Sequence, residues 1–93
     1  MTGQPPDALV ARARTQVARH LNIALESVTL QSATPQEWST GALGCPVPGH
    51  VYTQVITPGY LLIFTANNQR YEIHTNDRSD TLILCLNGRP TRL

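Results

Sequence analysis

The feature that most constrains the fold is a pair of asparagines, Asn67-Asn68, set between two β-rich runs. Asparagine tolerates the positive φ that a tight two-residue hairpin needs. A two-residue loop at this point produces the pairs Ala66–Gln69, Phe64–Tyr71, Leu62–Ile73 and Tyr60–Thr75. One face of the hairpin is then apolar, and a slip of one residue would scramble the two faces. The sequence therefore predicts an antiparallel hairpin with this register.

A further strand follows the polar run 76–79, which reads NDRS. A four-residue loop there sets Asp80 opposite Thr75, Leu82 opposite Ile73 and Leu84 opposite Tyr71. This register adds Leu82, Leu84 and Leu86 to the apolar face, and it places Ile83 and Cys85 beside Leu61 and Ile63 on the other face. A fully solvated sheet face would not be half apolar. Another part of the chain is therefore expected to cover part of this second face.

The start of the chain predicts an amphipathic helix over residues 6–21. Leu9, Ala13, Val17 and Leu21 recur every four residues and form one apolar stripe. Proline suits the first turn of a helix, so the pair before Asp7 favours a start there. The stripe is expected to lie on the apolar face of the sheet.

The remaining strands are predicted at residues 28–33 and at residues 51–56, which read VYTQVI. Pro35 either ends the first of these strands or marks it as an edge strand. Pro58-Gly59 fits the centre of a type II turn. The sequence thus predicts one α+β domain over residues 1–93, with a helix on an antiparallel sheet of four to five strands. Residues 1–5 and 88–93 are expected to be flexible ends.

The segment 38–49, from Trp38 to Gly49, reads as a long loop because it holds three glycines and two prolines in twelve residues. It is long and apolar enough to cover the second face of the sheet, and it carries Cys45. Its first role is therefore expected to be structural. Any binding role falls to the parts that remain exposed, around residues 39–42 or 47–50.

The two cysteines, Cys45 and Cys85, are either a disulfide or two buried thiols. A disulfide closing a loop of about 40 residues would contribute about 4 kcal/mol in the chain-entropy model. That contribution is large for a domain of this size, so we favour a disulfide or close apposition of the two side chains.

A metal site would need Cys45, His50, His74 and Cys85, whose spacing lacks a Cys-x-x-Cys pair. The expected register also sets His74 opposite Thr81, about 13 Å along a strand from Cys85. The same separation disfavours a Cys/His nucleophile pair. We therefore expect no metal, no cofactor and no catalytic set, and the chain reads as a non-enzyme.

The charges do not indicate a basic surface for nucleic acid, because the net charge is +1 and the arginines are scattered along the chain. No apolar run approaches the roughly 20 residues that span a bilayer, so membrane insertion is not expected. The first residues lack the basic and apolar regions of a signal peptide. As the sequence stands it reads as cytoplasmic, and as exported if a leader has been removed.

Several runs resemble a known group of proteins: Trp38 with LGCPVPG at 43–49, Tyr52-Thr-Gln54, Pro58-Gly59-Tyr60, and YEIHT at 71–75. The pattern is similar to that of small uncharacterised bacterial proteins, many of them cyanobacterial or from Chloroflexi. The resemblance covers nearly the whole chain and implies no activity. Export or lipid anchoring is common in the group, so the resemblance leaves the compartment open. Ile73 and His50 stand where an aromatic residue and a methionine are common.

These observations favour a non-catalytic binding or protein-interaction module, with an inhibitor-like role under the same heading. The candidate binding surface consists of Trp38, Leu43, Pro46, Pro48, His50, Tyr52 and His74. Two alternatives stay open. One is a small thiol- or metal-dependent protein that uses Cys45, Cys85 and His74. The other is a homodimer formed through an exposed sheet face or edge. The chain is therefore expected to be either a monomer or a homodimer. Its protein partner is unknown.

Overall fold

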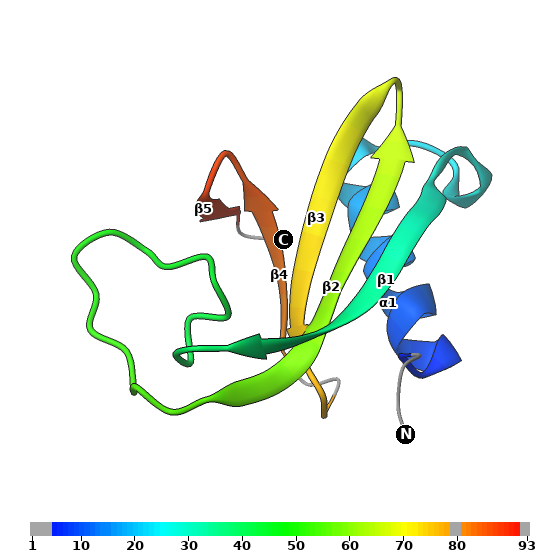
Figure 1. Ribbon diagram of the computed structural model, residues 1–93. Coiled ribbons are helices and arrows are strands. Elements are labelled where there is room, and N and C mark those ends of the chain that lie inside the picture. The colour runs from blue at the N-terminus through cyan, green and yellow to red at the C-terminus, as the bar shows by residue number, and fades with distance from the viewer. Residues whose placement is uncertain (1–4, 79–80, 92–93) are drawn as a thin grey trace.

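The computed structural model describes residues 5–78 and 81–91, and it contains one α-helix packed on one antiparallel sheet (Figure 1). The helix α1 spans Asp7–Leu21, and a single 3-10 turn, η1, follows at Leu25–Ser27. The strands are β1 (Thr29–Trp38), β2 (Thr57–Ala66), β3 (Gln69–Asn76), β4 (Leu82–Leu86) and β5 (Arg89–Thr91). They lie in the order of the chain, each antiparallel to the next. The predicted α+β class is confirmed.

The helix α1 matches the predicted range to within one residue. Pro6 occupies the N-cap position and Asp7 the first turn, where its charge complements the positive end of the helix dipole. Asn22 ends the helix in the left-handed conformation, with φ of 56°. The buried residues of the helix are Leu9, Ala13, Val17 and Ala18.

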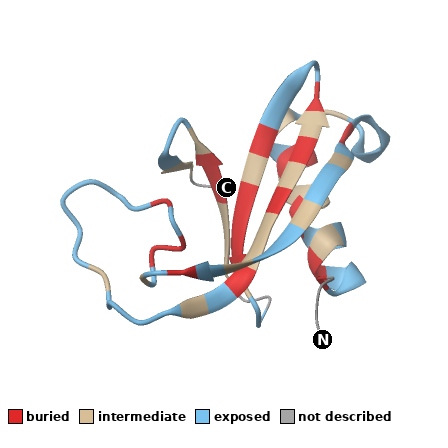
Figure 2. Ribbon diagram, in the orientation of Figure 1, coloured by how far each residue is buried: buried red, intermediate tan, exposed pale blue. Residues whose placement is uncertain are grey.

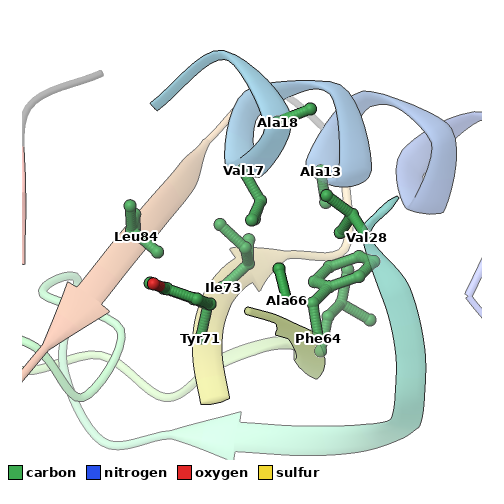
Figure 3. Packing of buried hydrophobic residues seen from close by; sticks show 10 residues of the cluster. Ala13, Val17, Ala18, Val28, Phe64, Ala66, Tyr71, Ile73 and Leu84 are labelled. Carbon is green, nitrogen blue, oxygen red and sulfur yellow. The ribbon is translucent and has the colours of Figure 1, made fainter. Parts of the chain in front are cut away.

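The core lies between this helix and one face of the sheet (Figure 3). Strands β2, β3 and β4 contribute a row of fully buried side chains in which Leu62, Ile73 and Leu84 are direct cross-strand neighbours. Phe64 and Tyr71 form the adjacent pair. The helix therefore covers the face that the sequence predicts to be apolar.

The hairpin at Asn67-Asn68 has the predicted register at every pair from Tyr60–Thr75 to Ala66–Gln69. Both asparagines have positive φ, 53° and 63°, as a two-residue loop of type I′ requires. The local chemistry of this turn and the apolar pattern of its strands agree, so the prediction is confirmed.

The predicted pairing of β3 with β4 is wrong by two residues. Thr75 pairs with Leu82 and Ile73 with Leu84, because β3 continues one residue further than expected, to Asn76. Asp80, which was predicted to face Thr75, lies outside the described residues. A shift of two residues leaves each side chain on its predicted face, since the side-chain period of a strand is two.

The strand at Thr29–Trp38 is longer than predicted and includes Pro35, which pairs with Tyr60. Pro35 therefore does not end the strand. The strand is at the edge of the sheet, where a residue without a backbone N–H is tolerated. The edge reading of Pro35 is confirmed.

Two further predictions are wrong in the connection to β2. Residues 51–56 form no strand, and Val51, Val55 and Ile56 are exposed. Pro58-Gly59 is not a turn but lies within β2, opposite Glu37 and Gln36 of β1. A Cβ at Gly59 would overlap the Thr75 carbonyl oxygen and lie 2.9 Å from Asn76 Cα. Glycine is therefore needed here for close approach of two strands.

The end of the chain carries a short strand where the sequence predicted a flexible tail. Arg89–Thr91 pairs with β4, after a turn in which Asn87 and Gly88 both have positive φ. Residues 92–93, and residues 1–4 at the other end, lie outside the described residues. Pro5 is buried.

Candidate functional site

The most unusual part of the molecule is the connection 39–56, which joins β1 to β2 and contains neither helix nor strand. It projects on the side of β4 and β5, away from the helix (Figure 1). In Figure 2 its inner part contains buried residues and its outer part is exposed. The buried residues are Ala42, Leu43 and Cys45. The connection therefore has a packed base, at residues 39–45, and an exposed outer part, at residues 46–56.

A disulfide joins Cys45 in the base to Cys85 on β4, with the two Cα atoms 6.0 Å apart. Both cysteines are buried. This bond attaches the connection to the face of the sheet opposite the helix, as the alternation along β4 predicts. No free cysteine remains in the described residues, so neither sulfur is available as a nucleophile or a metal ligand in this state.

A buried histidine, His74 on β3, forms the second attachment. Its Nδ1 lies 2.7 Å from the Leu43 carbonyl oxygen. A carbonyl oxygen only accepts, so Nδ1 donates this hydrogen bond. Its Nε2 lies 3.1 Å from Oε1 of Glu72, and Arg70 lies 3.5 Å from the other oxygen of that carboxylate. The histidine thus links the base of the connection to a partly exposed ion pair.

The indole of Trp38 forms the third attachment. Its ring stacks on the His74 ring with centroids 4.7 Å apart and planes tilted by 10°. Its Nε1–H donates to the Thr75 carbonyl oxygen at 2.9 Å, and this bond is buried. Tryptophan suits this buried position because its ring packs on His74 and its one polar group, the indole N–H, has a hydrogen-bond acceptor.

Backbone conformation in the base depends on two successive residues, Leu43 and Gly44, with positive φ of 56° and 75°. A Cβ at Gly44 would lie 2.7 Å from the Trp38 ring and 3.5 Å from Nδ1 of His74. The glycine therefore lets the backbone lie directly on the stacked rings. Leucine in this region is strained, and burial of the Leu43 side chain compensates for that strain.

The outer part of the connection is held by one hydrogen bond to the base and by hydrogen bonds within residues 47–52. The Gly41 N–H donates to the Thr53 carbonyl oxygen at 3.0 Å. The Val47 N–H donates to the Tyr52 hydroxyl at 3.0 Å, and the His50 N–H to the Val47 carbonyl at 3.1 Å. These bonds give the outer part a defined shape, although little of it is buried.

Four large apolar side chains are exposed on this outer part. Val51 is 96% exposed, Ile56 66%, Val55 57% and Val47 37%. Single exposed apolar residues are common, but here four fall within ten residues, and exposed apolar surface is a mark of interaction sites. Sequence reasoning missed this exposure because it placed residues 51–56 in the sheet. The signal that could have found it is the absence of Asp, Glu, Lys and Arg from residue 38 to residue 69.

The seven residues of the predicted binding surface fall into two groups. Trp38, Leu43 and His74 are buried and attach the base of the connection to the sheet. Pro46, Pro48 and His50 are exposed, and Tyr52 is half-buried. The structure therefore separates residues that hold the connection from residues that it presents to solvent.

The thiol and metal alternatives are not supported by the geometry. The described residues contain no group of three or more His, Cys, Asp or Glu side chains that could hold a metal ion. The predicted distance from His74 to Cys85 rested on the wrong register, since His74 pairs with Ile83, two residues from Cys85. Neither cysteine is a thiol nucleophile in this state, because both sulfurs are in the disulfide.

A shallow hollow of about 790 Å³ opens beside this site and reaches the turn at Asn87-Gly88. Arg70, Glu72 and His74 line it. Of the three, His74 has an oxygen atom within 3.1 Å of each ring nitrogen, one from Leu43 and one from Glu72. The hollow thus presents the Arg70–Glu72 ion pair, whose carboxylate also lies beside Nε2 of His74.

The chain belongs to a protein family described as a domain of unknown function, DUF8738, whose model matches residues 10–85. This range begins in α1 and ends at Cys85, so it includes the disulfide and the whole connection. No curated protein and no solved structure matches the chain. In the described part of the chain, no helix is long and apolar enough to cross a membrane.

Proposed function

We propose that this domain is a non-catalytic protein-interaction module that presents residues 46–56 to a protein partner. The observation that carries the proposal is the exposure of Val47, Val51, Val55 and Ile56 on a connection whose base is fastened to the sheet. An inhibitor-like role falls under the same heading, because inhibitors also present a held loop to their targets.

The fastened base explains why an exposed connection can bind. Ordering a loop during association costs free energy, and a loop that is already held avoids part of that cost. Here the disulfide, the His74–Leu43 hydrogen bond and the Gly41–Thr53 hydrogen bond hold the ends of the outer part. Rigid scaffolds with functional loops follow the same arrangement.

The chemistry of the outer part indicates how a partner is recognised. No Asp, Glu, Lys or Arg occurs from residue 38 to residue 69, so formal charges contribute little here. Recognition then depends on apolar contacts and on backbone hydrogen bonds. This composition disfavours nucleic acid and anionic membrane surfaces, which are bound through basic side chains.

The proposal is tested by capture with matched variants. The protein and its Val51→Asp/Val55→Asp variant are immobilised and exposed to extract of the producing organism. A Thr29→Asp variant, changed at an exposed position of β1, serves as the control. We expect a protein that the wild type and the control retain and the double variant loses. Retention of the same proteins by all three would refute a binding role for this surface.

We further propose that the protein works in an oxidising compartment of a bacterial cell. Disulfides persist in such compartments and are rare in the reducing cytoplasm, and the run LGCPVPG resembles a bacterial group in which export is common. Rapid acid quenching and alkylation of thiols in intact cells would test this. We expect Cys45 and Cys85 to be protected from alkylation, and two alkylated thiols would contradict the proposal.

A further inference from the structure

The segment 51–56 combines a strong preference for β-structure with the absence of a strand partner among the residues that the structure describes. Its sequence, VYTQVI, is rich in β-branched and aromatic residues. It contains no helix, turn or bend, and yet it forms no strand. Val51, Val55 and Ile56 are exposed as a result. The wrong prediction of a strand here thus identifies a segment whose pairing capacity is unused within the monomer.

One backbone edge of this segment has no hydrogen-bond partner in residues 5–78 and 81–91. The Thr53 carbonyl accepts the Gly41 N–H, so the edge that carries the polar groups of Thr53 faces the base of the connection. In an extended chain the backbone groups of successive residues point to opposite edges, so an extended segment 51–56 directs those of Tyr52 and Gln54 away from the base. Within the described chain, no hydrogen bond to the backbone of Tyr52 or Gln54 is found.

The segment also lacks the features that normally prevent pairing. Exposed strands are usually protected by lysine or other charged side chains, by proline, or by a covering element. Here the charged residues are absent from the whole range 38–69, and the prolines lie outside residues 51–56. An unprotected segment of this kind is a template for another strand.

The sequence of the segment is symmetric about Thr53, with a valine two residues before it and a valine two residues after it. We propose that residues 51–55 pair with the same residues of a second copy of this chain, as an antiparallel ribbon centred on Thr53. The proposal rests on the interaction role of residues 46–56 and names the partner. A two-fold contact must be self-complementary, and this pattern satisfies that condition.

The expected register follows from the free edge. Tyr52 exchanges backbone hydrogen bonds with Gln54 of the partner subunit, and Thr53 faces Thr53 of the partner subunit as a non-hydrogen-bonded pair. Val51 then lies opposite Val55 of the partner subunit. The three β-branched side chains of each copy share one face, opposite the Tyr52 hydroxyl, which accepts the Val47 N–H within its own chain.

The dimer is expected to be weak, because a two-stranded ribbon alone is marginal in water. Sedimentation velocity over concentrations up to about 1 mM, where weak complexes form, should show a monomer–dimer equilibrium for the wild type. Thr53→Lys and Thr53→Glu place like charges face to face at the two-fold axis, and each variant alone is expected to remain monomeric. Thr53 is exposed, so circular dichroism should show an unchanged fold.

The decisive arm is a mixture of the two variants. Since the register pairs residue 53 only with residue 53, equal amounts of Thr53→Lys and Thr53→Glu should restore the dimer. Ser39→Lys, at an exposed position of the same connection outside the segment, is the control and should dimerise as the wild type does. Concentration-dependent protection of the Tyr52 and Gln54 amides from hydrogen exchange provides a readout without substitutions.

Three results would overturn the proposal: a wild type that is monomeric throughout, a dimer that survives both Thr53 variants, or a mixture that stays monomeric. A monomeric wild type whose capture of another protein depends on Val51 and Val55 would remove the second copy as the partner. It would leave the interaction module standing, with a foreign chain on the same segment. If the wild type neither dimerises nor captures another protein through Val51 and Val55, both proposals are wrong.

Discussion

Removal of the disulfide is the perturbation whose magnitude follows most directly from the structure. The bond joins Cys45 to Cys85 across a sequence separation of 40 residues. In the chain-entropy model the entropy of closing such a loop corresponds to about 4 kcal/mol at room temperature. Small domains are stable by only about 5–15 kcal/mol. A Cys45→Ala/Cys85→Ala variant is therefore expected to lose a large fraction of the free energy of unfolding.

Thermal and denaturant unfolding, followed by far-ultraviolet circular dichroism, measure this loss. For a domain of this size a loss of 4 kcal/mol corresponds to a fall in Tm of about 16–32 °C. Wild-type protein unfolded in the presence of a reductant is the matched control, and its Tm should fall to that of the double variant. A Tm within a few degrees of the oxidised wild type in both samples would refute this account of how the connection is stabilised.

Three smaller perturbations test the contacts around the base of the connection and the central hairpin, each by denaturant unfolding. Gly59→Ala should destabilise the protein by about 1–3 kcal/mol or more, because the new Cβ meets the backbone of Thr75. Gly41→Ala, with open space around its Cβ, is the control. Equal denaturation midpoints for the two variants would contradict the close approach of the strands at Gly59. Trp38→Phe removes the buried bond to the Thr75 carbonyl and should cost about 1–3 kcal/mol; an unchanged midpoint would show that the bond contributes nothing. Asn68→Ala should cost about 1 kcal/mol and Asn68→Gly less, since the residue has φ of 63°; the reverse order would contradict the assigned turn.

The central hairpin could be predicted from the sequence because local and long-range requirements agree there. Asn67-Asn68 supplies the turn, and the apolar alternation of both strands supports only one register. The helix could be predicted for a similar reason, since a single apolar stripe and the proline pair before Asp7 indicate the same range. The faces of Leu84 and Cys85 were also predictable, because side chains alternate between the two faces of a strand. An error of two residues in the register therefore leaves each side chain on its predicted face.

The rest depended on contacts that a single sequence does not display. Pro58-Gly59 has the composition of a turn, but Gly59 is required because the Thr75 carbonyl lies where a Cβ would be. Residues 51–56 have the composition of a strand, but they lie in the connection beyond the end of β1 and pair with neither edge strand of the described sheet. His74 reads as a candidate ligand, whereas its burial and its bond to Leu43 give it a positioning role. Tertiary contacts override local propensity in each case.

The central claim is that the base of the connection is fastened to the sheet while its outer part is presented to solvent. Amide hydrogen exchange in dilute protein, with and without a reductant, tests this most directly. In the oxidised protein we expect slow exchange at Leu43 and Cys45, whose N–H groups are bonded within the base, and fast exchange at Val51. Reduction should accelerate exchange at Leu43 and Cys45 while Phe64 in the core stays protected. Exchange at Leu43 and Cys45 as fast as at Val51 in the oxidised protein would contradict the claim.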